Sequence, residues 1–105
     1  MPLQEINEHD VPIVQTGHGM TQWLVKSEDG SGPSIMIRHW GPNTDIPVHA
    51  HPYNEMFYVL EGEVIMGDTV YGPGSCLFYP KGTPYGPTRA PNGCKLLRYA
   101  EAGRD

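Results

Sequence analysis

The sequence predicts an all-β domain, either a barrel or a sandwich of short strands. No helical periodicity is sustained over about 11 or more residues. The 13 glycines and 11 prolines recur so often along the chain that no long helix fits between them. Hydrophobic residues nevertheless make up 38% of the chain, which is enough for a core, so the glycines and prolines indicate many tight turns in a folded protein.

Length and charge limit the possible architectures and partners. The 105 residues are enough for one domain and too few for two, so we expect a single domain over residues 1–105. A net charge of -5 without a run of Lys or Arg argues against nucleic-acid binding. No apolar stretch approaches the roughly 20 residues of a membrane span, and residues 1–10 lack the features of an export signal. We therefore expect a cytoplasmic protein with no nucleic-acid or membrane partner.

Short apolar segments separated by turn residues mark the predicted strands, which span 23–26, 34–40, 46–50, 55–61, 63–66, 75–79 and 96–100. The connecting segments are rich in Gly, Pro, Asn and Asp, as turns require. Residues 1–20 contain two prolines and two glycines and are expected to form an arm that lies over the barrel or over a partner subunit. Cys76 and Cys94 are not closely paired, so we expect free thiols that are buried or half-buried.

The segment from His49 to Glu55 carries the most distinctive chemistry. His49 and His51 are separated by one residue, so on an extended strand both imidazoles project from the same face and can share one ion. Pro52 and Asn54 favour a turn that returns Glu55 to the same point from the next strand. Two imidazoles and a carboxylate form a facial ligand set that suits Fe(II), Mn(II), Ni(II), Zn(II) or Co(II). The histidines expected to make only packing or solvent contacts are His9, His18 and His39.

The spacing of these residues resembles the first motif of the cupin family, here over residues 43–62. In that motif a glycine stands six residues before His-x-His, and a glutamate and a second glycine follow. The matching residues are His49, His51, Glu55 and Gly62. Asn43 stands at the first glycine, a tolerable replacement because Asn is the next best residue for a positive φ. The resemblance implies a cupin-type β-barrel, that is, a double-stranded β-helix or jelly roll.

A second cupin motif is matched in part over residues 74–89. The residues in register are Gly74, Pro80 and Gly82. Tyr85 replaces the usual histidine ligand, and Arg89 replaces the usual asparagine. Tyr85 either binds the metal as a phenolate or stands behind the ligands as a hydrogen-bond and proton donor. We favour the second role, since a phenol with a pKa near 10 ligates only if the ion stabilises its deprotonated form. A third possibility is a pocket that has lost its metal and binds an organic ligand alone.

Period-two alternation predicts which side chains share the barrel interior. If Glu55 points inward, Phe57 does so too and becomes part of the pocket wall. On the predicted strand 34–40, Arg38 and His39 face opposite sides, and either one can be the substrate contact. Further aromatic residues, which we expect to pack as core or dimer contacts rather than at the barrel mouth, are Tyr53, Tyr79 and Trp23.

Two classes of function follow. The first is a metalloenzyme with one divalent ion (Fe, Mn, Ni, Zn or Co) that acts on a small oxygenated organic molecule. Three protein ligands leave up to three positions of an octahedral ion for substrate and for O₂ or water, which supports dioxygenase chemistry, or lyase or isomerase chemistry in which Tyr85 moves the proton. The second is a non-catalytic module that binds or senses a small molecule or a metal. The family resemblance also implies a homodimer.

Overall fold

The computed structural model describes residues 1–17 and 19–103, which are built almost entirely of β-strands. The strands are β1 (Val14–Thr16), β2 (Gly19–Val25), β3 (Ser34–Trp40), β4 (Thr44–Ile46), β5 (Glu55–Gly62), β6 (Val64–Met66), β7 (Thr69–Tyr71), β8 (Cys76–Tyr79), β9 (Thr88–Ala90) and β10 (Cys94–Ala100). These residues contain no α-helix, and one 3-10 turn, η1 (Glu8–Asp10), precedes β1. No helix within the described ranges is long and apolar enough to cross a membrane. The predicted all-β class is confirmed.

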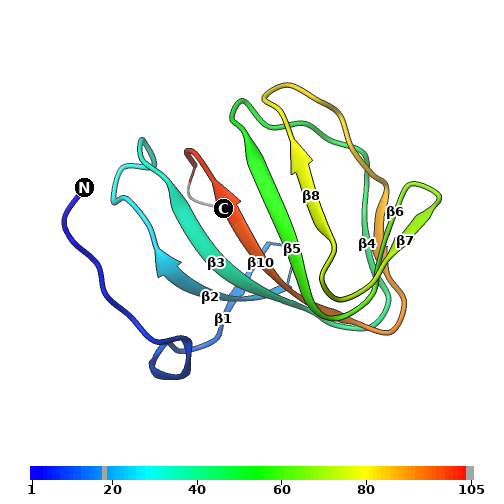
Figure 1. Ribbon diagram of the computed structural model, residues 1–105, viewed down its shortest axis with the longest axis horizontal. Coiled ribbons are helices and arrows are strands. Elements are labelled where there is room, and N and C mark those ends of the chain that lie inside the picture. Colours follow the sequence, from blue (N-terminus) through cyan, green and yellow to red (C-terminus); the bar gives the residue numbers. More distant parts are fainter. Residues whose placement is uncertain (18, 104–105) are drawn as a thin grey trace.

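The strands form two antiparallel sheets that curve around one interior (Figure 1). The larger sheet has the strand order β1-β2-β3-β10-β5-β8, and the smaller has the order β4-β9-β6-β7. From β3 onward the chain passes repeatedly from one sheet to the other, so strands far apart in the sequence become neighbours. This is the jelly-roll arrangement predicted from the sequence.

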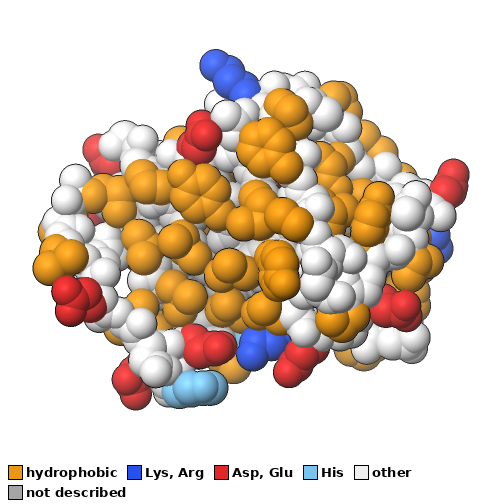
Figure 2. Space-filling view, viewed as in Figure 1, with side chains coloured by type: hydrophobic (Ala, Val, Ile, Leu, Met, Phe, Trp, Pro, Cys, Tyr) orange, Lys and Arg blue, Asp and Glu red, His pale blue; other side chains and the backbone are white. Residues whose placement is uncertain are grey.

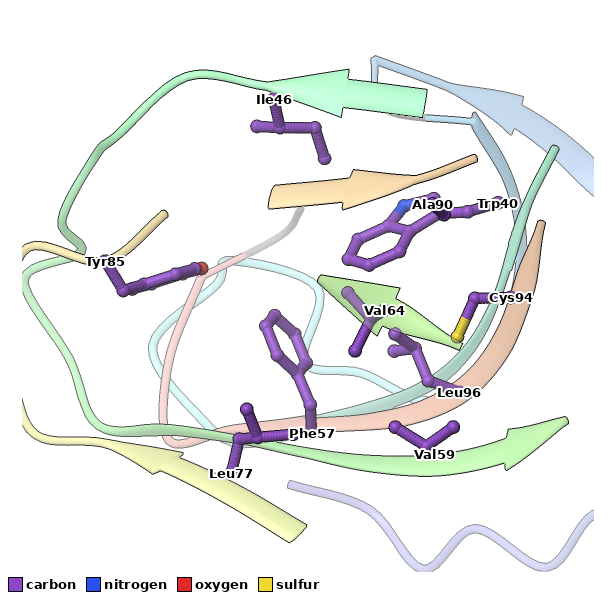
Figure 3. Close-up of a cluster of buried hydrophobic side chains, with 10 residues drawn as sticks. All are labelled: Trp40, Ile46, Phe57, Val59, Val64, Leu77, Tyr85, Ala90, Cys94 and Leu96. Carbon is purple, nitrogen blue, oxygen red and sulfur yellow. The ribbon is translucent and has the colours of Figure 1, made fainter. Parts of the chain in front are cut away.

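Side chains alternate between the interior and the outer surface of the larger sheet. Glu55, Phe57 and Val59 on β5 are all buried, whereas the residues between them are partly or fully exposed. The predicted inward direction of Glu55 and Phe57 is therefore confirmed. Apolar side chains also remain outside, as in the view of Figure 2, where they gather over the part of the surface formed by the larger sheet. The interior core shown in Figure 3 consists of Trp40, Ile46, Phe57, Val59, Val64, Leu77, Tyr85, Ala90, Cys94 and Leu96.

The backbone conformation of two turn residues, Asn43 and Gly62, explains why these residue types stand in the first motif. Asn43 has a φ of 67°, the left-handed conformation expected where the motif usually has glycine. Gly62 has a φ of 76°, and a Cβ there would lie 2.5 Å from the carbonyl oxygen of Gly93. A side chain at Gly62 would therefore push the end of β5 away from the start of β10, with which it pairs.

Several predicted boundaries differ from the structure. β1, β7 and β9, which have three residues each, are not predicted by the sequence patterns. The predicted strand 46–50 is displaced, because β4 ends at Ile46 and His49 makes only an isolated bridge to Tyr85. Pro47 lacks the amide hydrogen that would continue the ladder, which accounts for the early end of β4.

The predicted arm, residues 1–20, is shorter than expected. Its η1 turn is tied to the outer face of the larger sheet, where Gln22 Nε2 donates hydrogen bonds to the carbonyl oxygens of Glu8 at 2.7 Å and Val11 at 2.9 Å. Lys95 also forms an ion pair with Glu8 at 3.4 Å. From Val14 onward the chain belongs to the sheet, because β1 pairs with β2.

Candidate functional site

A pocket of about 210 Å³ lies inside the barrel and collects polar side chains from strands that are distant in the sequence. Its lining residues are Gly17, Arg38, Trp40, Ile46, His49, His51, Glu55, Phe57, Tyr85, Thr88 and Arg98. Pockets for drug-sized ligands begin at roughly 300 Å³, so this one suits a smaller molecule. The site residues predicted from the sequence that meet here are His49, His51, Glu55, Tyr85, Arg38 and Phe57.

His49 and His51 lie between β4 and β5, in a segment that is held by the backbone of the segment between β8 and β9. His49 and Tyr85 exchange two backbone hydrogen bonds of 3.1 and 2.9 Å, and the Gly82 amide donates to the His51 carbonyl at 2.8 Å. The two imidazole centroids are 4.9 Å apart. The histidines therefore share one region of the pocket without the extended strand that the sequence predicts for them.

The Nδ1 atom of each imidazole lies within hydrogen-bond distance of a polar group. His49 Nδ1 lies 2.9 Å from the Pro47 carbonyl oxygen, which can only accept, so the proton of a neutral His49 sits on Nδ1. His51 Nδ1 lies 3.2 Å from the Tyr53 hydroxyl. In each ring Nε2 is consequently the candidate ligand atom. Metal-binding histidines typically have this arrangement, with the second nitrogen held by a carbonyl or another polar group.

Glu55 is 1% exposed, and both of its carboxylate oxygens accept hydrogen bonds. The Tyr85 hydroxyl donates to Oε1 at 2.5 Å, and Arg98 Nε donates to Oε2 at 2.6 Å. Arg98 Nη2 donates in turn to the Tyr53 hydroxyl at 3.1 Å. Because Glu55 begins β5 and Arg98 lies on the neighbouring β10, strand pairing brings the ion pair together. Solvent screens this buried pair little.

Burial fixes the protonation of the groups around Glu55. It raises the pKa of the Tyr85 hydroxyl, and the hydrogen bond to Glu55 raises this pKa further, so Tyr85 is a protonated donor at neutral pH. Burial also lowers the pKa of His51, although the charge of Glu55 opposes that shift, so His51 is neutral at pH 7. The Tyr79 ring stacks on Tyr85 at 4.1 Å and holds the ring of Tyr85 in place.

Arg38 and His39 lie on opposite faces of β3, and Arg38 is the one that faces the pocket. Arg38 Nη1 donates to the hydroxyls of Thr16 at 3.1 Å and Thr21 at 3.3 Å. His39 Nε2 instead lies 2.7 Å from Gln22 Oε1 on the outer face. Between the two predicted alternatives, the structure therefore leaves Arg38 as the candidate substrate contact and corrects the placement of His39.

Phe57 and Tyr85 form part of the pocket wall and point toward one another in Figure 3, with ring centroids 6.0 Å apart. Of the other aromatic residues, Tyr53 contacts His51 and Arg98, whereas Trp23 lies near Lys26 instead. His9 lies in η1, away from the pocket lining, and His18 lies outside the described residues.

Sequence reasoning missed Arg98 and Trp40, both of which line the pocket. A signal for Arg98 was present, because it shares the period-two phase of Leu96 in the predicted strand 96–100. A charged residue in phase with a core leucine is either paired or functional. Trp40 likewise shares the inward phase of Arg38 on β3.

The donor set fits a divalent ion at the two histidines and fits less well at Glu55. His51 Nε2 lies 3.8 Å from Glu55 Oε2, but that oxygen already accepts the hydrogen bond from Arg98. Among residues 1–17 and 19–103, no three His, Cys, Asp or Glu side chains are grouped so that they could hold a metal ion as they stand. Glu55 completes the predicted ligand set only if its carboxylate shares or exchanges one of its present hydrogen bonds.

Comparison with known proteins adds a family profile and a group of similar structures. The profile described as "Cupin domain" matches residues 36–96, which include the histidine pair, Glu55 and Tyr85. No curated protein matches the sequence.

The solved structures show the same fold over nearly the whole chain. An RmlC-like cupin from Shewanella frigidimarina is 22% identical with a TM-score of 0.81, over 95% of this chain and 91% of that one. The polyketide cyclase RemF from Streptomyces resistomycificus is 25% identical with a TM-score of 0.75, over 95% of this chain and 80% of that one. KdgF from Halomonas sp. is 15% identical with a TM-score of 0.77, over 100% of this chain and 97% of that one.

Proposed function

Since this chain belongs to the cupin family, we propose that it binds a small oxygenated organic molecule in the barrel pocket and exchanges a proton with it. A divalent ion held at His49 and His51, with Glu55 as a third ligand after rearrangement, is part of the same proposal. The observation that carries it is the direct hydrogen bond of 2.5 Å between Tyr85 and Glu55, in the same pocket as both imidazoles.

Tyr85 and Glu55 form a hydrogen-bonded pair in which the hydroxyl is the donor and the carboxylate is the acceptor. The Tyr85 hydroxyl is protonated and lines the pocket, so it can donate a hydrogen bond to a substrate oxygen. Because its raised pKa makes it a weak acid, it would transfer the proton only to an oxygen on which substantial negative charge develops. One oxygen of Glu55 accepts a hydrogen bond from the same hydroxyl, and the other accepts from Arg98. This pairing favours lyase or isomerase chemistry over chemistry that needs no proton donor.

The histidine pair supports the metal part of the proposal. The Pro47 carbonyl fixes the tautomer of His49, and the Tyr53 hydroxyl orients the ring of His51. A divalent ion at these residues would supply a Lewis acid for a substrate oxygen. Phe57 and Ile46 wall the pocket with apolar surface, which excludes water from the reacting groups.

The similarity to RemF supports an oxygenated organic substrate, since that protein is a polyketide cyclase and the match covers 95% of this chain. The pocket of about 210 Å³ nevertheless favours a smaller molecule than a drug-sized ligand.

A second candidate function is non-catalytic binding of a small molecule. One observation favours it: both oxygens of Glu55 are already satisfied by Tyr85 and Arg98, so the carboxylate has no need of a further partner. In that case the pocket captures its ligand without turnover, and the histidines act only as hydrogen-bonding groups.

Metal retention tests the proposal. Protein produced without added metal is subjected to elemental analysis, and the metal-depleted protein is then titrated with Co²⁺ and followed by visible absorption. We expect saturable binding that His49→Ala and His51→Ala each abolish, with His9→Ala as a control outside the pocket lining. Equal Co²⁺ binding by all three variants would contradict the metal site, and no binding by the wild type would favour the second candidate.

A further inference from the structure

We propose that the ligand of the pocket carries a carboxylate that Arg98 and Arg38 bind, and that the Trp40 indole N–H donates to a second acceptor group of the same ligand. The inference rests on the proposed function in one respect, because it names the substrate class of the same pocket. It does not depend on the metal ion.

The formal charges of the lining residues are the first support. Arg38 and Arg98 carry two guanidinium groups, which stay protonated in proteins, whereas Glu55 is the one acidic residue in the lining. The lining therefore contains more basic than acidic side chains. Arg38 is 5% exposed and Arg98 is 2% exposed, so water has little access to either guanidinium group. Such a lining favours an anionic ligand over a cationic one.

Two unsatisfied donors are the second support. Arg98 Nη1 and Trp40 Nε1 are buried and have no hydrogen-bond partner within the described part of the chain. Native proteins satisfy the great majority of buried donors, so each exception calls for a ligand, a water molecule or a functional role. Because both residues line the pocket, a ligand with acceptor oxygens at two of its groups would account for both donors.

Strand register places the three side chains in a row. Arg38 pairs with Leu96, and Arg98 stands two residues farther along β10, so the arginines are diagonal neighbours on the inner face. Trp40 follows Arg38 at the next inward position of β3, opposite Cys94 and on the far side of Arg38 from Arg98. A planar carboxylate suits the two guanidinium groups, which bind carboxylates through paired hydrogen bonds, and Trp40 would donate to a second acceptor group of the ligand. The uncharged part of the ligand would then reach Tyr85 and the histidine pair.

A matched pair of small probes tests the charge requirement. Protein with the Trp23→Phe substitution, which leaves Trp40 as its one tryptophan, is treated with a chelator and titrated with malonate or with its neutral analogue malonamide at constant ionic strength. We expect malonate to give a saturable change in Trp40 fluorescence and a rise in Tm, and malonamide to give neither. Equal effects of the two probes, no effect of malonate, or tighter binding of inorganic phosphate would overturn the proposal.

Arginine variants test the location. Arg38→Gln leaves the Arg98–Glu55 ion pair intact and should weaken malonate binding by about tenfold or more, as expected for the loss of a charged hydrogen-bond donor. Arg89→Gln, on the exposed side of β9, removes the same charge and should bind malonate like the parent protein. Equal affinity of Arg38→Gln and Arg89→Gln would overturn the assignment. Because the chelator is present throughout, failure of the metal site would leave this result unaffected.

Discussion

Tyr85 donates a hydrogen bond of 2.5 Å to Glu55 and thereby links the segment before β9 to the start of β5. Glu55 belongs to the first motif predicted from the sequence, and Tyr85 to the segment predicted as the second, where the resemblance implies that it takes the place of a histidine. The other carboxylate oxygen of Glu55 is bound by Arg98. Tyr85 therefore supplies a hydrogen-bond donor to a buried carboxylate that also has a positively charged partner.

Tyr85→Phe should keep the metal stoichiometry of the wild type and abolish any proton-transfer activity. The substitution removes the hydroxyl that donates to Glu55 but leaves the His49 and His51 rings untouched. Loss of a buried hydrogen bond should also lower the free energy of unfolding by about 1–3 kcal/mol. Elemental analysis and urea unfolding measure the two effects.

Tyr85→His provides the matched comparison, since it restores the usual residue of the motif and should tighten metal binding. If Tyr85 is itself a ligand, Tyr85→Phe will lose the metal, and ferric wild-type protein will show a phenolate-to-iron absorption band. Either observation would contradict the role of Tyr85 as a proton donor.

Arg98→Met should destabilise the protein by about 3–5 kcal/mol, because it leaves Glu55 buried without its charged partner. Both side chains are at most 2% exposed and their nearest atoms are 2.6 Å apart. Combining this change with Glu55→Gln should recover part of the loss, as measured by chemical unfolding. Lys95→Met serves as the control, since its partially exposed ion pair with Glu8 should contribute about 1 kcal/mol or less. Equal costs for the two single variants would contradict the importance of the buried pair.

The sequence predicts β3 and β5 closely because their signals are local, whereas β2 and β10 each begin earlier than predicted. β3 spans the predicted residues 34–40, and β5 differs from its predicted range by one residue at its end. Alternating burial and flanking turn residues define both strands without reference to a partner strand. β7 has only three residues, and its pairing with β6 rather than any periodicity makes it a strand.

The site is predictable where it depends on short spacing and unpredictable where it depends on strand pairing. His49, His51 and Glu55 lie within seven consecutive residues, so one motif finds all three. Arg98 reaches Glu55 only because β10 pairs with β5 in the register that sets Ala100 opposite Glu55. Neither this register nor the direction of the carboxylate oxygens is contained in a local pattern.

We propose that the protein is a homodimer that buries the outer face of the larger sheet. Tyr58 on β5 is 40% exposed and Phe78 on the adjacent β8 is 59% exposed, so two neighbouring strands present aromatic side chains to solvent on one face. β8 is also an edge strand whose unpaired backbone needs protection. Light scattering at micromolar concentration should give twice the chain mass of 11.6 kDa.

Charged substitutions locate that interface. Tyr58→Asp and Phe78→Asp should each shift the protein toward the monomer, whereas Val70→Asp, at an exposed position of the smaller sheet, should not. A monomeric mass for the wild type would refute the dimer, and dissociation by Val70→Asp alone would place the interface elsewhere.

The two cysteines should differ in reactivity. Cys94 is buried on β10 as predicted, whereas Cys76 on β8 is exposed, contrary to the sequence prediction. Burial raises the pKa of the Cys94 thiol to about 11, so at pH 8 it contains almost none of the reactive thiolate. Cys76 pairs with Tyr58 and would be covered in the proposed dimer, so the test uses the monomeric Tyr58→Asp variant. A disulfide reagent should modify only Cys76 in this folded variant and both thiols in urea. Fast modification of Cys94 in the native state would contradict its place in the core.

The raised pKa of Cys94 also predicts how stability depends on alkaline pH. In the unfolded chain the thiol ionises near its ordinary pKa of 9.0, whereas in the folded protein it stays protonated up to about 11. Above pH 9 the folded state binds more protons than the unfolded state, so the free energy of unfolding falls as pH rises toward 11. Urea unfolding between pH 8 and pH 10.5 measures the slope. Cys94→Ala should show a shallower decline, and Cys76→Ala should follow the wild type. If Cys94→Ala and the wild type have the same slope, ionisation of this buried thiol does not contribute to the alkaline loss of stability.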